Sequence, residues 1–255
     1  SDSGGMLNKI FAGALNKIHD SVKLKKLIKL IDEENWTSKE FDVKGEIYES
    51  LLQKNAENSG AGQYFTPRAI IYTMVECIQP KPKETIADPS CGTGGFFLGV
   101  LNYLNKEKLT KNEADFLKFK TFHGWEIEKS TARLCLMNLF LHGVGDLKTT
   151  PDIEVTDSLK REKEGKVSEI EKVDIILANP PFGVSSSDIP TLDEKQAGKD
   201  GYFLRKDFWV STSNKQLAFL QHIVTMLKEN GRAAVVLPDN VLFEGGAGET
   251  IRKNL

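Results

Sequence analysis

The first part of the chain has the hydrophobic pattern of amphipathic helices. Between residues 6 and 58, apolar residues recur with the three-to-four-residue spacing of a helix face, among many lysines and glutamates. The clearest members of this series are Leu7, Ile10, Phe11, Leu24, Leu27, Ile28, Ile31, Tyr48, Leu51 and Leu52. The pattern predicts an N-terminal helical region over residues 1–60, which ends at the Gly- and Ser-containing run 58–62.

After residue 62 the pattern changes to short β-rich runs that alternate with helical stretches. Strands are expected at residues 85–87, 121–125, 153–156, 173–178 and 233–237, and helices at residues 69–78, 96–104, 131–141 and 217–228. Alternation of this kind requires crossover connections between parallel strands. The sequence therefore predicts an α/β fold over residues 61–255, with a doubly wound, mostly parallel sheet of the Rossmann-like type. The charged stretch 160–172 and the polar stretch 185–214 are expected to be loops.

Composition narrows the classes of partner that the chain can bind by itself. The 255 residues include 34 Lys and Arg against 36 Asp and Glu, so the formal net charge is -2. A protein that holds duplex DNA by bulk charge needs an excess of cationic side chains to replace phosphate counterions. Nucleic-acid contacts are therefore expected to be local, or to be provided by a partner.

No stretch of the sequence has the length and apolarity of a transmembrane helix, and residues 1–5 lack the features of a signal peptide. We interpret residues 1–5 as a remnant of cloning that precedes Met6. The cysteines Cys77, Cys91 and Cys135 are odd in number and lack metal-ligand spacing, so neither a metal site nor a disulfide framework is expected. A reducing cytoplasm is the expected location, with no membrane contact.

The first predicted strand is followed by a glycine-rich turn, in the sequence Asp88-Pro89-Ser90-Cys91-Gly92-Thr93-Gly94-Gly95-Phe96. Glycines let the backbone approach a ligand closely, and the helix start behind them offers free amide groups. The spacing matches neither the G-x-G-x-x-G dinucleotide fingerprint nor a phosphate-binding loop. The strand-end carboxylate of Asp88 would repel a pyrophosphate and suits a cationic ligand. The alternative is a tight turn that binds nothing.

Carboxylates also follow the second and third predicted strands. Glu126 stands at the end of the second strand, where a carboxylate can accept hydrogen bonds from both hydroxyl groups of a ribose. Asp157 follows the third strand and could accept from the amino group of a purine. The alternatives are a solvated charge for Glu126 and a helix cap ahead of Ser158 for Asp157.

The sharpest motif is Asn179-Pro180-Pro181-Phe182, directly after the fourth predicted strand and called the tetrad below. Two adjacent prolines restrict the backbone, so the carbonyl of Pro180 points in a fixed direction with little entropy left to lose. With the side-chain oxygen of Asn179 it forms two acceptors for one NH2 group, and Phe182 supplies a flat face for stacking. The alternative is a proline-stiffened strand exit without chemistry.

A further motif, Gln63-Tyr64-Phe65-Thr66-Pro67-Arg68, precedes the first strand and leads into the apolar helix expected at residues 69–78. Thr66 followed by Pro67 is the pattern of a helix N-cap with proline in the first turn, and such a helix start can bind a carboxylate. Plain capping, without a ligand, is the alternative.

Taken together, these motifs resemble the methylation subunits of type I restriction-modification systems, a family of S-adenosylmethionine-dependent, adenine-specific DNA methyltransferases. The resemblance covers about residues 40–255 and is specific because the motifs occur in the family's order. It implies that the cofactor is S-adenosylmethionine and that its binding residues are Gln63, Tyr64, Phe65, Thr66, Asp88, Cys91, Gly92, Thr93, Gly94, Gly95, Phe96, Glu126, Ile127 and Asp157. It also implies a catalytic role for the tetrad Asn179, Pro180, Pro181 and Phe182.

The resemblance assigns a role to each group. By this resemblance, the segment around Thr66 would bind the methionine carboxylate of the cofactor, and Asp88 with the glycine turn would bind its ammonium end. Glu126 would bind the ribose hydroxyls and Asp157 the adenine amino group, while Ile127 would pack on the purine face. The tetrad would grip the exocyclic nitrogen of an adenine flipped out of duplex DNA. Hydrogen bonds to that amine would localise its lone pair and aim it, so no strong base is needed. Methylation of cytosine C5 is disfavoured, because no cysteine follows the fourth strand.

The family acts in a complex, so the resemblance also implies partners. A specificity subunit reads the DNA sequence and a nuclease-translocase subunit cuts it, and the N-terminal helical region is expected to help dock them. A final helix is expected near Gly248, whereas the family continues with further strands. The methyltransferase domain is therefore expected to be truncated at its C-terminal end, with an exposed sheet edge.

The sequence is also compatible with other functions. A methyltransferase of the same fold acting on a protein glutamine amide or on RNA also fits the tetrad, although the motifs around the first strand favour DNA. A non-catalytic scaffold would use the sheet only for assembly. The stretch 185–214 either forms a lid or DNA-contacting loop, or is anchored to the core by its aromatic and cationic side chains, which are Tyr202, Phe203, Arg205, Phe208 and Trp209.

Overall fold

The computed structural model describes residues 5–33, 66–106, 108–160, 162–163, 166–167, 172–199 and 201–255. Its α-helices are α1 (Met6–Phe11), α2 (Ser21–Asp32), α4 (Arg68–Ile78), α5 (Gly95–Leu104), α6 (Lys111–Phe119), α7 (Lys129–Leu141), α8 (Lys215–Met226) and α9 (Ala247–Asn254). Its strands are β1 (Ile86–Asp88), β2 (Phe122–Glu126), β3 (Asp152–Val155), β4 (Glu162–Lys163), β5 (Lys166–Val167), β6 (Val173–Ala178), β7 (Ile189–Thr191), β8 (Tyr202–Leu204) and β9 (Leu227–Val235). A 3-10 helix, η2, covers Asp239–Leu242.

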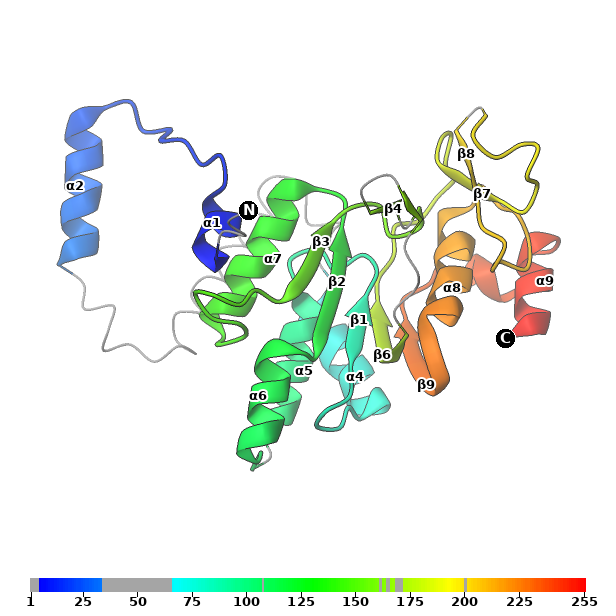
Figure 1. The fold of residues 1–255 in the computed structure, drawn as a ribbon, viewed down its shortest axis with the longest axis horizontal. Coiled ribbons are helices and arrows are strands. Elements are labelled where there is room, and N and C mark those ends of the chain that lie inside the picture. Colours follow the sequence, from blue (N-terminus) through cyan, green and yellow to red (C-terminus); the bar gives the residue numbers. More distant parts are fainter. Residues whose placement is uncertain are drawn as a thin grey trace.

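The main sheet is parallel and has the strand order β3-β2-β1-β6-β9 (Figure 1). The chain moves outward from β1 to β3 and then returns to the other side of β1 at β6, which is the doubly wound topology. Ligands of such sheets bind outside the carboxyl ends of the strands, where the order reverses. The predicted fold class is confirmed, and the reversal between β1 and β6 marks the expected place of the site.

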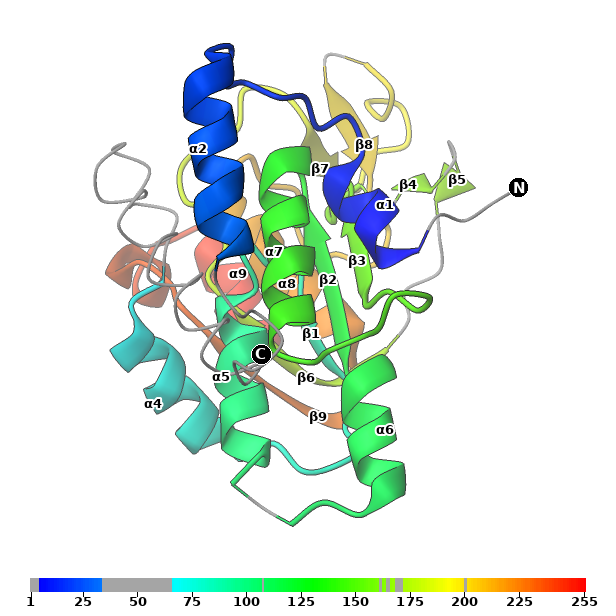
Figure 2. The same ribbon diagram turned by 90° about the vertical axis from the view of Figure 1, so that its left-hand side faces the viewer.

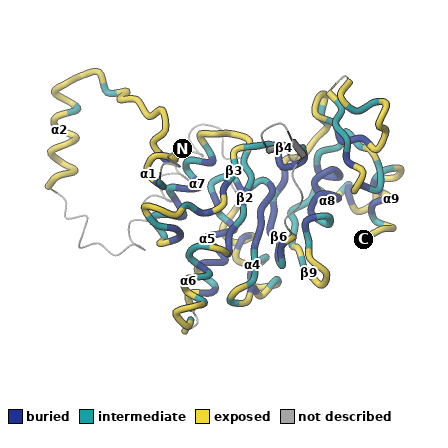
Figure 3. Tube along the Cα trace, in the orientation of Figure 1, coloured by how far each residue is buried: buried dark blue, intermediate teal, exposed yellow. Residues whose placement is uncertain are grey.

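Both faces of the sheet are buried. On one face Ile175 and Leu177 of β6 join a core formed with α4, α5 and α7, while on the other Ile176 packs with Ile223 and Met226 of α8. Figure 1 shows α5 and α7 on one side of the strands and α8 on the other, and Figure 3 shows the central strands β1 and β6 as mostly buried. Successive residues of β6 therefore point to opposite faces, and the strand is apolar from Ile175 to Ala178, which explains why this part of the sequence predicted a buried strand.

Two elements differ from the hydrophobic pattern. Helix α6 was not predicted, because charged and polar residues outnumber apolar ones in it and Leu117 is its one buried residue. Its start is nevertheless encoded by a capping box, in which the Glu113 carboxylate accepts from the Thr110 backbone N–H at 2.8 Å. Strand β9 begins at Leu227, well before the predicted residue 233. Its pairing with β6 shifts register between Val173 and Ile175.

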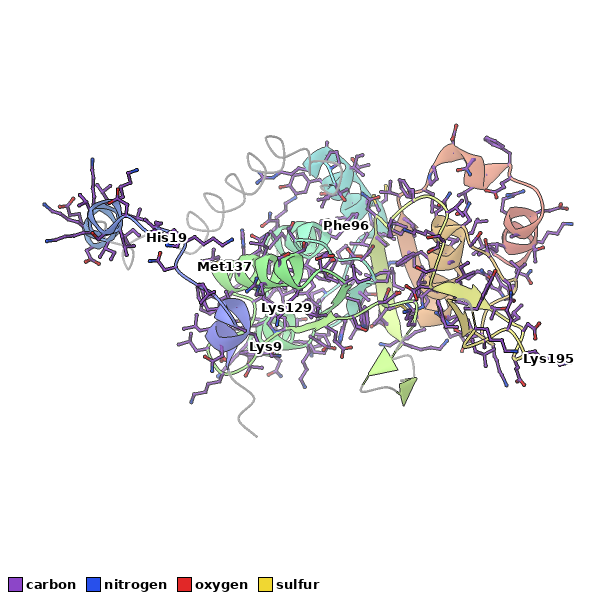
Figure 4. All side chains as sticks on the ribbon, turned by 90° about the horizontal axis from the view of Figure 1, so that it is seen from above. Lys9, His19, Phe96, Lys129, Met137 and Lys195 are labelled. Carbon is purple, nitrogen blue, oxygen red and sulfur yellow. The ribbon has the colours of Figure 1, made fainter. Side chains whose placement is uncertain are left out.

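The N-terminal region contains one helix that packs on the sheet domain and one that does not. Helix α1 lies beside α7 (Figure 2), where Met6 and Ile10 are buried in the main core and Arg133 donates to the carbonyl of Ala12 at 3.0 Å. Helix α2 buries none of its residues, and it stands apart from the sheet in Figures 1 and 4. The predicted apolar series around Tyr48 and the domain boundary at residue 60 lie outside the described residues, so that boundary stays a prediction.

The stretch 185–214 is attached to the domain by buried side chains. It contains the paired strands β7 and β8, and Arg205, which is 2% exposed, lies at its inner side. The Arg205 guanidinium donates to Asp207 at 2.7 and 2.8 Å and to the carbonyl of Leu159 at 2.8 Å, and it stacks 3.9 Å from the ring centroid of Phe208. For these residues the contacts favour anchoring over a lid, whereas Lys195 points outward at the far end of the loop (Figure 4).

Replacing Arg205 by methionine is expected to destabilise the protein. The change removes the hydrogen bonds from Arg205 to the Asp207 carboxylate and the Leu159 carbonyl, so we expect a loss of about 2–3 kcal/mol in the free energy of unfolding, measured by urea denaturation. Lys206→Met is the control, because the Lys206–Glu194 ion pair is on the surface and its loss should change stability by less than about 0.5 kcal/mol. Equal stability of both variants would contradict the anchoring role.

Membrane insertion has no support from the described helices: none of them combines the length and apolarity needed to cross a bilayer.

Candidate functional site

The glycine turn after β1 and the tetrad after β6 lie next to each other. Strand β1 pairs directly with β6, with Ile86 opposite Ile175. The hydroxyl of Ser90 lies 3.4 Å from the Asp88 carboxylate and 3.4 Å from the backbone oxygen of Asn179, so it bridges the two strand ends. The two motifs that the sequence singled out therefore form one site, at the point where the strand order reverses.

Asp88 is a buried carboxylate at the centre of this site. It is 2% exposed and accepts a hydrogen bond from the Ser90 backbone N–H at 2.9 Å. Burial raises the pKa of Asp88 to about 7, with a smaller contribution from the nearby Glu126 carboxylate. Asp88 has no cationic partner among the described residues, and a buried carboxylate with a raised pKa is suited to bind a cationic group that a ligand would bring.

Glu126 is built into the same turn. One of its carboxylate oxygens accepts from the Gly92 backbone N–H at 3.0 Å, and the other accepts from the Glu128 backbone N–H at 2.9 Å. Gly92 and Gly94 have φ angles of +54° and +84°, which side-chain-bearing residues adopt with difficulty. A carboxylate offers about four lone-pair directions, so Glu126 keeps acceptor capacity for a ligand. It is held in place rather than solvated as a loose charge.

Besides Asp88, two of the predicted cofactor residues have buried side chains. Cys91 is 4% exposed and Phe96 is 3% exposed, and both pack in the main core. Contact with the Cys135 thiol and burial raise the pKa of the Cys91 thiol, so this cysteine is neutral at pH 7. These two residues can offer a ligand only their backbone atoms, whereas Ile127 is 66% exposed and presents its side chain to solvent.

Asp157 lies in a turn that hydrogen bonds connect to the rest of the site. Its carboxylate accepts from the Leu159 backbone N–H at 3.0 Å, and no helix begins there, so the helix-cap alternative is wrong. Burial raises the pKa of the Asp157 carboxyl group above its usual value. The buried hydroxyl of Ser158 donates to the carbonyl of Pro89 at 2.8 Å, which joins this turn to the turn after β1.

Thr66 contacts the tetrad and does not cap a helix. The helix α4 begins at Arg68, with Pro67 at the cap position and no side-chain cap, so the predicted N-cap role of Thr66 is wrong. Its hydroxyl oxygen instead accepts from the Asn179 side-chain amide at 3.0 Å. Because that contact uses the amide nitrogen, the side-chain oxygen of Asn179 is left as an acceptor, without a hydrogen bond to any described residue. Gln63, Tyr64 and Phe65 lie outside the described residues.

The aromatic member of the tetrad is accessible. Phe182 is 47% exposed, whereas Pro180 is buried directly after β6. The site thus combines a buried carboxylate, a second carboxylate on a glycine turn, an unused amide oxygen and an exposed aromatic ring. This set can bind a cationic ligand and, beside it, a planar group that carries an amine.

Sequence reasoning missed the residues that connect these parts. Asn138 of α7 is 1% exposed and donates to the Thr93 carbonyl in the glycine turn at 3.1 Å, while its side-chain oxygen has no partner among the described residues. Ser90 and Ser158 make the other connections. Nothing in the sequence marks these contacts, because each joins residues that approach one another only in the folded chain.

Comparison with known proteins identifies close relatives. A family model described as N-6 DNA methylase matches residues 39–255. The StySJI type I restriction enzyme methylase subunit of Salmonella typhimurium is 37% identical over 267 residues, covering 100% of this chain and 47% of that protein. The EcoKI methylase subunit of Escherichia coli K12 is 36% identical over 266 residues, covering 100% of this chain and 47% of that protein. The chain spans about half the length of the curated relatives it matches.

Solved structures show the same similarity. The crystal structure of the EcoKI M protein has a TM-score of 0.61 and 38% identity, over 75% of this chain and 37% of that chain. A structure of a type I restriction-modification system, described for its assembly and conformational transition, has a TM-score of 0.77 and 30% identity, over 98% of this chain and 48% of that chain.

Proposed function

We propose, from the premise that this chain belongs to the N-6 DNA methylase family, that it methylates the exocyclic amino group of adenine in DNA as the modification subunit of a type I restriction-modification complex. The observation that carries the proposal is the junction at the strand reversal, where Ser90 joins the buried Asp88 carboxylate to the backbone of Asn179. This contact supports the proposal, because it connects the carboxylate proposed to bind a cation with the tetrad proposed to bind an amine.

The residues around the glycine turn fit S-adenosylmethionine. Its ammonium group would provide the cationic partner that the buried Asp88 lacks among the described residues, and its ribose hydroxyls would use the remaining acceptor capacity of Glu126. The exposed side chain of Ile127 would cover the purine, and Asp157 would accept from the purine amino group. Gln63, Tyr64, Phe65 and Thr66 remain proposed ligands of the carboxylate. When bound, the cofactor supplies a methyl group on a sulfonium, which is activated for displacement.

The tetrad positions the nucleophile. The side-chain oxygen of Asn179 and the carbonyl of Pro180 would accept the two N–H groups of adenine N6, which withdraws the nitrogen lone pair from the ring and aims it. Phe182 would stack on the base after its extrusion from the duplex. The exposure of that ring and the contact of Asn179 with Thr66, which leaves the amide oxygen available, support these roles.

Partners and location follow as parts of the same proposal. The net charge of -2 supports a division of labour in which a specificity subunit holds the DNA sequence, and a nuclease-translocase subunit completes the complex. The relatives named above are methylase subunits of such enzymes. We place the protein in the cytoplasm, where its DNA substrate is found.

The test is a methylation assay on the full-length protein reconstituted with its specificity subunit. After incubation with S-adenosylmethionine carrying a labelled methyl group, mass spectrometry of the digested DNA should detect labelled N6-methyldeoxyadenosine. Label on a protein glutamine or on RNA would replace the proposal by the corresponding methyltransferase. A complex that binds DNA but transfers no label would indicate a scaffold.

A further inference from the structure

Residues at the start of helix α8 form hydrogen bonds with the backbone of Gly183, directly after the tetrad. The Gly183 N–H donates to the side-chain oxygen of Gln216 at 2.9 Å, and the Gly183 carbonyl accepts from the Lys215 backbone N–H at 2.8 Å. The next residue, Val184, pairs with Asn214 in an isolated antiparallel bridge. The chain that leaves Phe182 is thus held by the start of α8 through both backbone groups of Gly183.

Gln216 is unusual in its position. It is 5% exposed and precedes Leu217, which is fully buried. A buried side-chain amide destabilises a protein unless it is hydrogen-bonded. The side-chain oxygen of Gln216 accepts its hydrogen bond from the backbone N–H of Gly183, a residue that is itself exposed. The contact therefore does little to shield Gly183 from water. The hydrogen bond instead fixes the orientation of the peptide group that joins Phe182 to Gly183.

Gly183 shows why direction matters here. Its φ angle is +105°, yet a Cβ atom at this position would meet nothing within 4 Å. The glycine is therefore required by the backbone turn and not by lack of space. A glycine at such a turn is free to adopt other conformations, so a separate contact must select the one observed. The Gln216 side chain and the Lys215 amide supply that selection.

We infer that Gln216 is a positioning residue that sets the orientation of the Phe182 ring toward the base on which the tetrad acts. The inference rests on the proposed function. Phe182 lies between two anchored points, since Asn179 is bound to Thr66 and Ser90 on one side and Gly183 is bound to Gln216 on the other. Without the Gln216 contact, the Lys215 amide and the Val184–Asn214 bridge still hold the second point, but the peptide between Phe182 and Gly183 loses its hydrogen bond. The ring then keeps its exposure with a less defined plane, and stacking on an extruded base weakens.

Gln216→Met tests the inference, because methionine keeps the length of the side chain and removes the acceptor. In the reconstituted complex we expect kcat/KM for duplex DNA to fall about tenfold, since stacking is a substantial part of holding an unpaired base. Affinity for S-adenosylmethionine, measured by isothermal titration, should stay within about twofold, because Gln216 touches none of the cofactor residues. Fluorescence of 2-aminopurine at the target position should show less base extrusion than in the wild type.

Two further variants separate positioning from general stability. Gln216→Glu retains an acceptor for the Gly183 N–H and should recover most of the DNA activity. Gln221→Met is the matched control, because Gln221 is also buried on α8 but holds the backbone of Trp209 and Val210, away from the tetrad. It should lower the melting temperature without a selective loss of base extrusion.

The outcomes distinguish this inference from the function on which it rests. A wild-type complex that methylates no adenine overturns both. Normal methylation and base extrusion by Gln216→Met, in an assay where Asn179→Ala is inactive, overturns the positioning role alone. An equal loss of base extrusion in Gln221→Met and Gln216→Met would also overturn it, because the effect would then follow stability and not the direction of Phe182.

Discussion

Asn179→Ala is expected to lower kcat for adenine methylation by about 100- to 1000-fold, the range seen when a preorganised hydrogen-bond group is removed from a reaction centre. The variant loses the side-chain oxygen that would accept from the target amine, and the Pro180 carbonyl remains as a single acceptor. Affinity for S-adenosylmethionine should change by less than about threefold, because the cofactor carboxylates Asp88 and Glu126 keep their contacts. Single-turnover transfer of labelled methyl groups and isothermal titration measure the two effects.

Thr66→Val is the graded control for that experiment. Valine keeps the shape of threonine but removes the acceptor that the Asn179 amide nitrogen uses at 3.0 Å. The Asn179 oxygen stays in the site with a less defined direction. We therefore expect a smaller decrease of about tenfold in kcat, measured at saturating S-adenosylmethionine so that the proposed role of Thr66 in cofactor binding does not contribute. Methylation within about threefold of wild type in Asn179→Ala would show that the tetrad is structural and that the proposed mechanism is wrong.

Asp88→Asn should weaken binding of the cofactor at least about 30-fold while making the ligand-free protein more stable near neutral pH. Asparagine keeps an oxygen that can accept from the Ser90 N–H, but it removes the charge that would pair with the cofactor ammonium. Loss of one partner of a buried charged contact weakens binding by about 2–5 kcal/mol, or at least about 30-fold in Kd. Titration with S-adenosylhomocysteine, which carries the same ammonium group, measures this without methyl transfer.

The stability effect follows from the raised pKa of Asp88. With a pKa of about 7 in the folded protein and 3.8 as its reference value, the native state binds this proton more tightly than the unfolded chain between those pH values. The contribution of Asp88 to stability is therefore most favourable below pH 3.8 and is lost as the pH rises through about 7. Above that pH its charge disfavours folding by on the order of 4 kcal/mol, at about 1.4 kcal/mol per pKa unit.

Urea denaturation of Asp88→Asn and the parent protein at several pH values tests this directly. The variant should exceed the parent in free energy of unfolding above about pH 7, and the difference should shrink as the pH falls toward about 4. Glu126→Gln is the comparison, since Glu126 is held by the Gly92 and Glu128 amides and is not a buried, unpaired charge. A pH-independent difference for Asp88→Asn would mean that its carboxyl group is not desolvated as the structure indicates.

Local sequence patterns predicted much of the fold and several residues of the candidate site. The apolar run 175–178 in β6 and the alternation of short strands with apolar helices predicted a doubly wound sheet, because burial on both faces favours apolar residues at successive positions of a central strand. Asp88, Glu126 and Asn179 were identifiable because ligand-binding residues of such sheets follow the strands directly. Helix α6 was missed because it lies in a mostly charged and polar stretch and buries one side chain.

The sequence by itself determined the fold class, the strand ends and the chemical groups at each of them, since hydrophobic periodicity, glycine and proline act over a few neighbouring residues. Only the tertiary structure decided which groups meet. Thr66 and Asn179 are 113 positions apart, and Gly183 and Gln216 are 33 apart, so neither contact has a local pattern. The raised pKa of Asp88 also required the folded protein, because it results from burial that several elements create together.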